Sequence, residues 1–204
     1  MPKVSQEYAD ARRLQILDAA QRCFLRAGFH ETSMQDIFAE CGLSSGAVYL
    51  YFPGKDALVL ELARENLRDV SEVVRRLSRS GTSQAPGKVL SSVLSLMRKK
   101  HRENGFATLL VQIWSKALTD PQLGEVFRTL QRELRDEFTD YVREHQAASS
   151  MSAHRDPAAV AGALLGSMQG YILQLAMYGP RGVDGMADAL AGVWTQALSG
   201  ENLS

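Results

Sequence analysis

Small and hydroxyl-bearing side chains are concentrated in one stretch of the sequence, CGLSSGAVYLYFPGKDAL, which runs from Cys41 to Leu58. Serine hydroxyls can donate to or accept from base edges and phosphates, and small side chains let a backbone approach a ligand closely. A tyrosine hydroxyl or a lysine ammonium group can hold a phosphate. The chemistry indicated is noncovalent recognition of nucleic acid, and the residues that could supply it are Ser44, Ser45, Gly46, Ala47, Tyr49, Tyr51 and Lys55.

These residues need short helices to project them and a longer helix to support them. Apolar periodicity predicts a helix over residues 10–27 that stops at Gly28. Ser33 and Asp36 approximate a capping box and predict a second helix that ends near Glu40. A turn at residues 41–44, a third helix over 45–51 and a long helix from 55 into the seventies complete a helix-turn-helix pattern. On composition alone, a helical hairpin with small packing residues is the alternative.

The same residues carry a resemblance to a known family. The pattern Ile16-Leu17-x-Ala19-Ala20, Phe24, Gly28-Phe29, Thr32-Ser33, Ile37 is followed by Gly42-Leu43-Ser44-x-Gly46-x-Val48-Tyr49-x-Tyr51-Phe52-x-x-Lys55-x-x-Leu58. It resembles the N-terminal domain of the TetR family of transcriptional repressors over about residues 12–62. Phe38 and Leu50 depart from the usual pattern, and Phe38 predicts local repacking. The resemblance implies an all-helical dimer with two DNA-reading heads and a variable C-terminal sensor domain.

The resemblance also implies roles for individual residues. Ser33 and Gln35 would contact phosphate or base, Ser45 and Ala47 would face bases, and Gly46 would permit close approach. Tyr49, Tyr51 and Lys55 would hold the DNA backbone. The first 60 residues contain 6 Lys/Arg and 7 Asp/Glu, so DNA binding requires well-placed cations. We expect them to be Lys3, Arg12, Arg13 and Lys55, with the acidic side chains turned away.

Helical periodicity continues through the C-terminal part of the chain. After a polar loop at 79–87, it predicts helices over about 86–103, 106–118, 121–141, 157–178 and 184–198. Asp120-Pro121 and Asp156-Pro157 each supply an N-cap and a proline at the first helical position. The predicted fold is all-α, with a helix-turn-helix DNA-binding domain over 1–54 and a helical-bundle domain for ligand binding and dimerisation over 55–204.

The helix predicted over 157–178 is apolar on more than one face, which requires cover on two sides. A partner subunit could supply one side, and a homodimer would match a palindromic operator. Close packing within the chain is the alternative explanation for the small residues. The predicted dimer interface consists of Gly162, Gly166, Gly170, Trp194 and Leu198.

A sensor pocket is expected among the middle helices, where aromatic, methionine and a few polar side chains suit a small, mostly apolar effector. A stripe of apolar residues does not distinguish a pocket wall from a filled core, so core packing remains the alternative for each residue. The candidates are Met97, His101, Phe106, Leu110, Trp114, Phe127, Met168, Tyr171, Ile172 and Leu175.

Composition limits the other functions. Lys+Arg and Asp+Glu are both 23 among 204 residues, so a large cationic surface is excluded. The sequence MPKVSQEYADARR has no signal-peptide core, and we expect a cytoplasmic protein without a membrane span. No spacing suggests an enzyme, a metal site or a cofactor. The leading hypothesis is a repressor released from double-stranded operator DNA by its effector; the alternative is a helical interaction protein with degenerate heads.

Overall fold

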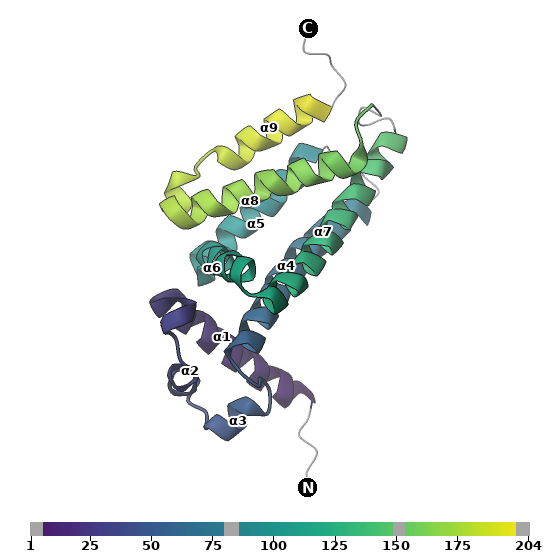
Figure 1. The fold of residues 1–204 in the computed structure, drawn as a ribbon. Helices are drawn as coiled ribbons and strands as arrows, with labels where there is room; N and C mark the ends of the chain where they lie inside the picture. The colour runs from purple at the N-terminus through teal and green to yellow at the C-terminus, as the bar shows by residue number, and fades with distance from the viewer. Residues whose placement is uncertain (1–5, 80–85, 149–153, 199–204) are drawn as a thin grey trace.

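The computed structural model describes residues 6–79, 86–148 and 154–198, and these ranges form nine α-helices without a strand (Figure 1). In chain order the helices are α1 (Gln6–Glu31), α2 (Met34–Cys41), α3 (Ser45–Tyr49), α4 (Lys55–Arg79), α5 (Pro86–Asn104), α6 (Phe106–Thr119), α7 (Pro121–Ala147), α8 (Pro157–Gly182) and α9 (Met186–Leu198). The all-α prediction is confirmed.

Helices α1 to α3 form a small N-terminal unit, here called the head (Figure 1). Its capping box is present: Ser33 Oγ accepts the Asp36 amide at 3.2 Å, and Asp36 Oδ2 accepts the Ser33 amide at 2.8 Å. Gly42 ends α2 at φ +68°, a left-handed conformation that glycine adopts without strain. Ile37 of α2 and Val48 of α3 are fully buried in the shared core, and α2 packs against both α1 and α3.

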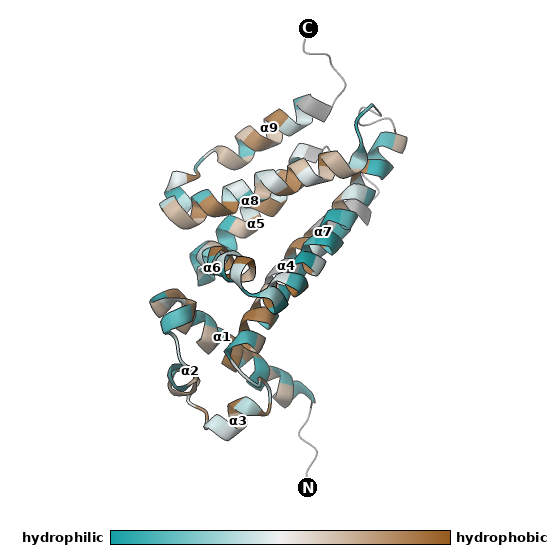
Figure 2. Ribbon diagram, viewed as in Figure 1, coloured by the Kyte–Doolittle hydropathy of each residue, from teal (hydrophilic) through white to brown (hydrophobic). Residues whose placement is uncertain are grey.

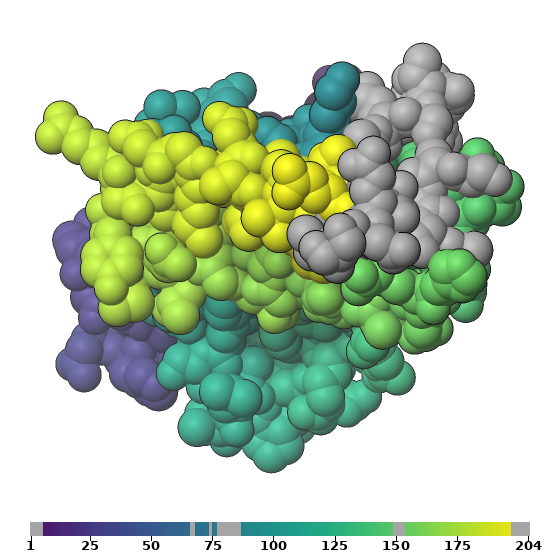
Figure 3. Space-filling view, turned by 90° about the horizontal axis from the view of Figure 1, so that it is seen from above, coloured from purple at the N-terminus to yellow at the C-terminus, as the bar shows by residue number. Residues whose placement is uncertain are grey.

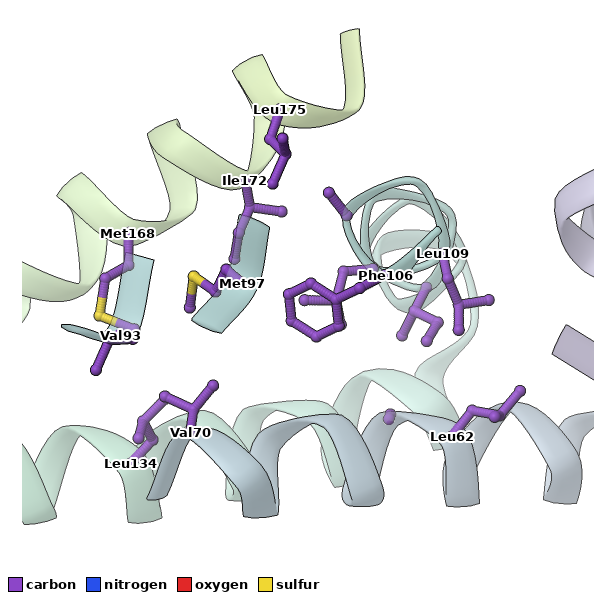
Figure 4. Close-up of a cluster of buried hydrophobic side chains, with 14 of the residues drawn as sticks. Leu62, Val70, Val93, Met97, Phe106, Leu109, Leu134, Met168, Ile172 and Leu175 are labelled. Carbon is purple, nitrogen blue, oxygen red and sulfur yellow. The ribbon is translucent and has the colours of Figure 1, made fainter. Parts of the chain in front are cut away.

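Helix α4 leaves the head and runs through the bundle beside α7 (Figure 1). Its inner side buries Leu62 and Val70, because apolar residues recur there at helical spacing. Helices α5, α6, α7 and α8 close around the same core, and their apolar side chains converge on it (Figure 4). The predicted caps are confirmed at α7 and α8, where Asp120 and Asp156 accept backbone amides of the first turn.

Helix α8 is apolar over most of its length, whereas α7 carries many hydrophilic residues (Figure 2). By length and hydropathy α8 would also suit a membrane span, but core helices of helical bundles pass the same test, and α8 packs against α5, α6 and α7. Helix α9 packs on α5 and lies beside α8 on one face of the molecule (Figure 3), where Trp194 Nε1 donates to Ser167 Oγ at 3.1 Å.

Several predicted boundaries differ from the structure. Helix α1 begins at Gln6, before the predicted start, while Gly28 does break its helical geometry with φ +83°. Helix α3 ends at Tyr49, two residues earlier than predicted. Helix α9 starts at Met186, because Gly185 has φ +73° and cannot continue a helix there. The predicted loop over 79–87 falls mainly on residues 80–85, which lie outside the described ranges. The predicted domain boundary between residues 54 and 55 stays a prediction.

Candidate DNA interface and ligand cavity

The start of α3 presents the small residues singled out from the sequence. Ser44 is the N-cap of α3, and its Oγ accepts the Ala47 amide at 3.3 Å. Ser45 and Gly46 are exposed, and no heavy atom outside the local backbone lies within 4 Å of a Cβ placed at Gly46. Ser44 therefore shapes the helix, while Ser45 and Gly46 leave its first turn open to an approaching surface.

The end of α3 carries two exposed side chains. Tyr49 is 49% exposed, and its ring meets the Phe38 ring edge-on at a centroid distance of 5.5 Å. Phe38, which departs from the family pattern, thus supports Tyr49 from α2. Leu50 is 85% exposed, an unusual position for a leucine, and sequence reasoning missed it as a contact candidate. The only indication in the sequence was that Leu50 occupies a position where the family pattern usually has a polar or aromatic residue.

Two predicted phosphate contacts have other partners in the structure. Tyr51 is half-buried and packs against the core of the head. Lys55 Nζ donates to the carbonyl oxygens of Phe29 and Thr32, both at 2.7 Å, and lies 4.4 Å from the centre of the Phe29 ring. Lys55 therefore closes the C-terminal end of α1 instead of projecting a free charge, because an ammonium group satisfies the orphan carbonyls there.

The acidic side chains of the head are not simply turned away from its cations. Glu40 pairs with Arg22 at 2.6 Å and with Arg26 at 3.2 Å, and the two arginines lower the pKa of Glu40. Arg13 pairs with Glu61 at 2.7 Å.

Arg12 is bonded only to uncharged groups, the Tyr8 hydroxyl at 2.9 Å and the Gln15 amide oxygen at 2.7 Å. Among the described residues of the head, Arg12 is the arginine without a carboxylate partner. Lys3 lies outside these residues. Ser33 and Gln35, at the start of α2, are both exposed.

An apolar cavity lies where α4, α5, α6, α7 and α8 meet. Several of its lining residues belong to the cluster of buried side chains in Figure 4, among them Val70, Met97 and Phe106. The cavity itself has a volume of about 20 Å³, and the empty space around it, including its opening to solvent, is about 360 Å³. Six of the ten predicted ligand residues line it: Met97, Phe106, Leu110, Trp114, Met168 and Ile172. Gln169, one of the few polar side chains expected in the pocket, lines it as well, and sequence reasoning missed the other four: Val70, Gln131, Leu134 and Leu165.

Four predicted ligand residues lie elsewhere. Tyr171 and Leu175 are buried in the core away from the cavity, and burial raises the pKa of Tyr171. Phe127 lines an outer groove between α7 and α8. His101 Nδ1 accepts the Ala107 amide at 3.3 Å and so caps the start of α6, where Gly105 offers no side chain; burial lowers the pKa of His101.

The polar groups of the cavity are few. The Trp114 indole N–H is buried without a hydrogen-bond partner among the described residues, which is costly unless a ligand or water accepts from it. Gln169 Nε2 lies 3.5 Å from Gln131 Oε1, at the edge that the cavity shares with the outer groove. A mostly apolar ligand with at least one hydrogen-bond acceptor suits this lining.

Helix α6 connects this cavity to the head. Phe106, Leu110 and Trp114 line the cavity from one side of the helix. From the other side, Gln112 Nε2 donates to the Phe24 carbonyl of α1 at 3.3 Å, and Lys116 Nζ lies 4.8 Å from the centre of the Phe29 ring. Lys116 also pairs with Asp120 at 2.7 Å and lies 3.5 Å from Asp56, at the start of α4.

The outer faces of α8 and α9 carry exposed apolar side chains. Gly166, Gly170, Leu173 and Met177 recur at spacings of three and four along α8, which puts them on one face. No heavy atom outside the helix backbone lies within 4 Å of a Cβ placed at Gly166 or Gly170, so packing within the described chain does not require these glycines.

The remaining residues of the predicted interface have other surroundings. At Gly162 a Cβ would lie 3.3 Å from the Arg135 guanidinium. Trp194 bonds to Ser167 within the chain, as described above. The Leu198 side chain lies outside the described residues. Val193 is 60% exposed on α9 and was missed by sequence reasoning.

Comparisons with known proteins match both parts of this architecture. A family model described as bacterial regulatory proteins, tetR family, matches residues 16–62. A second, described as the C-terminal domain of BetI-type transcriptional repressors, matches residues 85–199, more than half of the chain. The chain belongs to the TetR family. It is 32% identical to the HTH-type transcriptional repressor Rv1474c of Mycobacterium tuberculosis over 149 residues. The matched region covers 73% of this chain and 74% of that protein.

Solved structures have the same fold. GusR of Salmonella enterica superposes with a TM-score of 0.80 at 23% identity, over 96% of this chain and 98% of that chain. A SmeT–triclosan complex superposes with a TM-score of 0.71 at 21% identity, over 95% and 94% of the two chains. This TetR-family protein is therefore a DNA-binding transcriptional regulator with an N-terminal helix-turn-helix and a helical C-terminal domain.

Proposed function

We propose that this TetR-family regulator represses transcription as a homodimer on a palindromic operator and releases it when a small, mostly apolar effector enters the cavity. The observation that carries the proposal is the position of α6, which lines the cavity with one side and contacts the head with the other. The SmeT–triclosan complex supports a small-molecule effector, because SmeT has the same fold and is bound to triclosan in that structure.

On the operator, the exposed first turn of α3 would enter the major groove. Ser45 and Gly46 permit close approach, and the Ser45 hydroxyl can bond to a base edge. Tyr49, held by Phe38, would donate its hydroxyl to a phosphate. Leu50 would contact a thymine methyl group, because an exposed apolar side chain beside the groove has that partner available. Gln35, which is exposed at the start of α2, would make a flanking contact.

In the dimer, the glycine and apolar face of α8 would pack against its symmetry copy, with Val193 of α9 at the edge. Leu173 and Met177 are 44% and 63% exposed in the single chain, and a two-fold interface would remove this apolar area from water. The two heads would then read half-sites separated by about one helical turn of DNA, 34–36 Å, or multiples of it.

Effector binding would act on the head through α6 and α4. A ligand against Phe106, Leu110 and Trp114 would shift α6, and α6 would carry Lys116 and Gln112 with it. Lys116 lies against both Phe29 of α1 and Asp56 at the start of α4, so the tilt of α4 and the separation of the two heads would change. The coupling requires only that the ligand binds the released state more tightly than the DNA-bound state.

The deciding experiment is an electrophoretic shift assay, at stated salt, with DNA from upstream of the protein's own gene. We expect sequence-specific binding by the wild type and about tenfold weaker binding by Tyr49→Ala, with only a small loss of melting temperature from the lost Phe38 contact. Absence of specific binding by folded protein would instead favour a helical interaction protein with degenerate heads. A large loss of melting temperature in Tyr49→Ala would assign Tyr49 to packing.

The proposal places the protein in the cytoplasm, where its operator lies, and treats it as a regulator without catalytic activity. Family membership supports both points.

A further inference from the structure

We propose that Gln15 determines how well the protein distinguishes its operator from other DNA, although the Gln15 side chain itself does not contact the DNA. Gln15 would act by holding Arg12, a phosphate contact, at a fixed position relative to the turn that leads into α3. The inference rests on the proposed function, because that function places α3 in the major groove.

The side-chain amide of Gln15 bridges two segments of the head. Its Oε1 accepts a hydrogen bond from Arg12 Nη1 at 2.7 Å, and its Nε2 donates to the Cys41 carbonyl at 2.8 Å. Cys41 is the last residue of α2, and only residues 42–44 separate it from α3. The arginine requires an acceptor and the carbonyl requires a donor, so the two bonds fix the amide in one orientation. Arg12 is thereby linked to the turn of the helix-turn-helix.

Tyr8 holds the guanidinium group of Arg12 through a second set of contacts. Arg12 Nε donates to the Tyr8 hydroxyl at 2.9 Å, and Arg12 Cζ lies 4.9 Å from the centre of the Tyr8 ring. The bonds to Tyr8 and Gln15 use two of the five guanidinium N–H groups, and the others can donate to a phosphate. Because this long side chain is ordered before DNA arrives, DNA binding costs less side-chain entropy.

Arg12 lies at the end of the molecule that would meet the DNA. The N-terminal part of α1 and helix α3 both lie at the end opposite α9 (Figure 1). Farther along α1, the charges of Arg22 and Arg26 are paired with Glu40. Arg12 is bonded to two uncharged groups instead, so its positive charge is kept for a phosphate beside the surface that α3 presents.

The link through Gln15 has a consequence for specificity. Phosphate contacts set the position of a protein on the duplex, and base contacts read the sequence. With Arg12 tied to the turn before α3, the phosphate contact and the base contacts of α3 form together only when both are in register. On other DNA the charge of Arg12 is sufficient, because nonspecific binding depends on charge and not on register.

The test compares the full-length wild type with Gln15→Met, which has nearly the same shape and leaves the charge of Arg12 in place. Fluorescence anisotropy at one fixed salt concentration measures binding to DNA from upstream of the protein's own gene and to a shuffled fragment of the same composition. Gln15→Met should bind the upstream DNA about tenfold more weakly. Its affinity for the shuffled DNA should change by less than about twofold. Equal losses on both fragments, or no loss on either, would overturn the proposal.

Gln21→Met is the matched control. Gln21 lies on the same helix, and its Nε2 also donates to the carbonyl of a helix-terminal residue, Asn104, at 2.6 Å, but it has no arginine partner. Both variants lose such a bond, and both should bind as folded proteins below their melting temperatures. Only Gln15→Met should lose specificity, and an equal loss of specificity in Gln21→Met would reduce the effect to general loosening of α1.

A double-mutant cycle shows whether Gln15 acts through Arg12. In the Arg12→Gln background, adding Gln15→Met should cause no further loss of operator affinity, because the side chain that Gln15 positions is already absent. A full additional loss would mean that Gln15 contacts DNA directly and would refute the positioning role. Tyr8→Phe keeps the ring but removes the hydroxyl, and it should lower operator affinity by about threefold, again only when Arg12 is present.

The same titrations separate this inference from the proposed function. Wild-type operator affinity in folded Gln15→Met would refute the positioning role and leave the repressor proposal intact. Absence of sequence-specific binding by the folded wild type would refute the repressor proposal and the positioning role together.

Discussion

The ammonium group of Lys55 closes the end of helix α1 by donating to the Phe29 carbonyl at 2.7 Å while lying 4.4 Å from the centre of the Phe29 ring. This contact ties the first residue of α4 to the last turn of α1, across the junction of the head and the bundle. The negative end of the α1 dipole and the ring face both favour a cation there.

Replacing Lys55 with Met should lower the free energy of unfolding by about 2 kcal/mol, because two carbonyl oxygens lose a charged donor. Lys55→Arg should recover only part of the loss, since a planar guanidinium does not fit two carbonyls converging on one point. Urea unfolding measures both. If Lys55→Met instead left stability unchanged and weakened operator binding, Lys55 would contact a DNA phosphate, as the family resemblance implies.

Alanine substitutions of the two adjacent serines at the start of α3 should have different effects on stability and on operator binding. Ser44→Ala removes the N-cap of α3 and should cost about 1 kcal/mol of stability. Ser45→Ala removes an exposed hydroxyl and should leave the melting temperature unchanged while weakening operator binding. The opposite pattern, a destabilised Ser45→Ala and a neutral Ser44→Ala, would contradict the observed cap.

Stability should depend on pH through His101. Its folded-state pKa lies below the ordinary value of 6.5 because burial disfavours the charged ring, and the neutral ring is the form that accepts the Ala107 amide. The unfolded chain then binds the proton more readily, so stability is complete above 6.5 and decreases as pH falls through 6.5 towards the folded pKa.

Melting temperatures from about pH 8 to about pH 5 measure this effect. His101→Asn keeps an acceptor that does not titrate there and should remove this part of the pH dependence. His154→Asn, at an exposed site, is the matched control and should leave the dependence as in the wild type. An identical pH profile in His101→Asn and the wild type would refute the assignment.

Operator binding should show a weak dependence on salt. If Arg12 of each head contacts one phosphate, the plot of log affinity against log salt has a slope of about −2, or about −4 if Lys3 contributes as well. Arg12→Gln should make the slope shallower by about 2. Arg22→Gln, whose charge is already paired with Glu40, should leave it unchanged. A wild-type slope several times steeper would require cations that the ion pairs of the head do not leave available.

The exposed face of α8 and α9 should control the oligomeric state. The double variant Leu173→Glu, Val193→Glu would bury four like charges in a two-fold interface and should yield monomers in sedimentation velocity experiments. Leu118→Glu is the control, because Leu118 is 88% exposed on α6, a helix that does not belong to this face. A dimer that survives the double substitution would place the interface elsewhere.

Local chemistry made much of the fold predictable. Ser33 with Asp36, Asp120 with Pro121 and Asp156 with Pro157 each place a helix start within a few residues, and all three starts are confirmed. The helical periodicity of the core is equally local. The predicted helix ends were less accurate, because a single glycine with positive φ, such as Gly185, can interrupt a helix without changing the apolar periodicity.

The site was less predictable because it depends on contacts between distant segments. Lys55 bonds to carbonyls more than 20 residues away, and its sequence position at a helix start gives no sign of them. Met168 lines the cavity, whereas Leu175, on the same apolar stripe of α8, does not. Which of the two meets empty space depends on the packing of neighbouring helices.

The division of α6 between two neighbours has a practical consequence for engineering. Phe106, Leu110 and Trp114 lie against the cavity, while Gln112 and Lys116 contact the head, so the two sets can be exchanged independently. Libraries that vary only the first set should yield biosensors for new analytes that still recognise the original promoter. Libraries that vary only the second should tune the sensitivity and dynamic range of the response at constant analyte specificity.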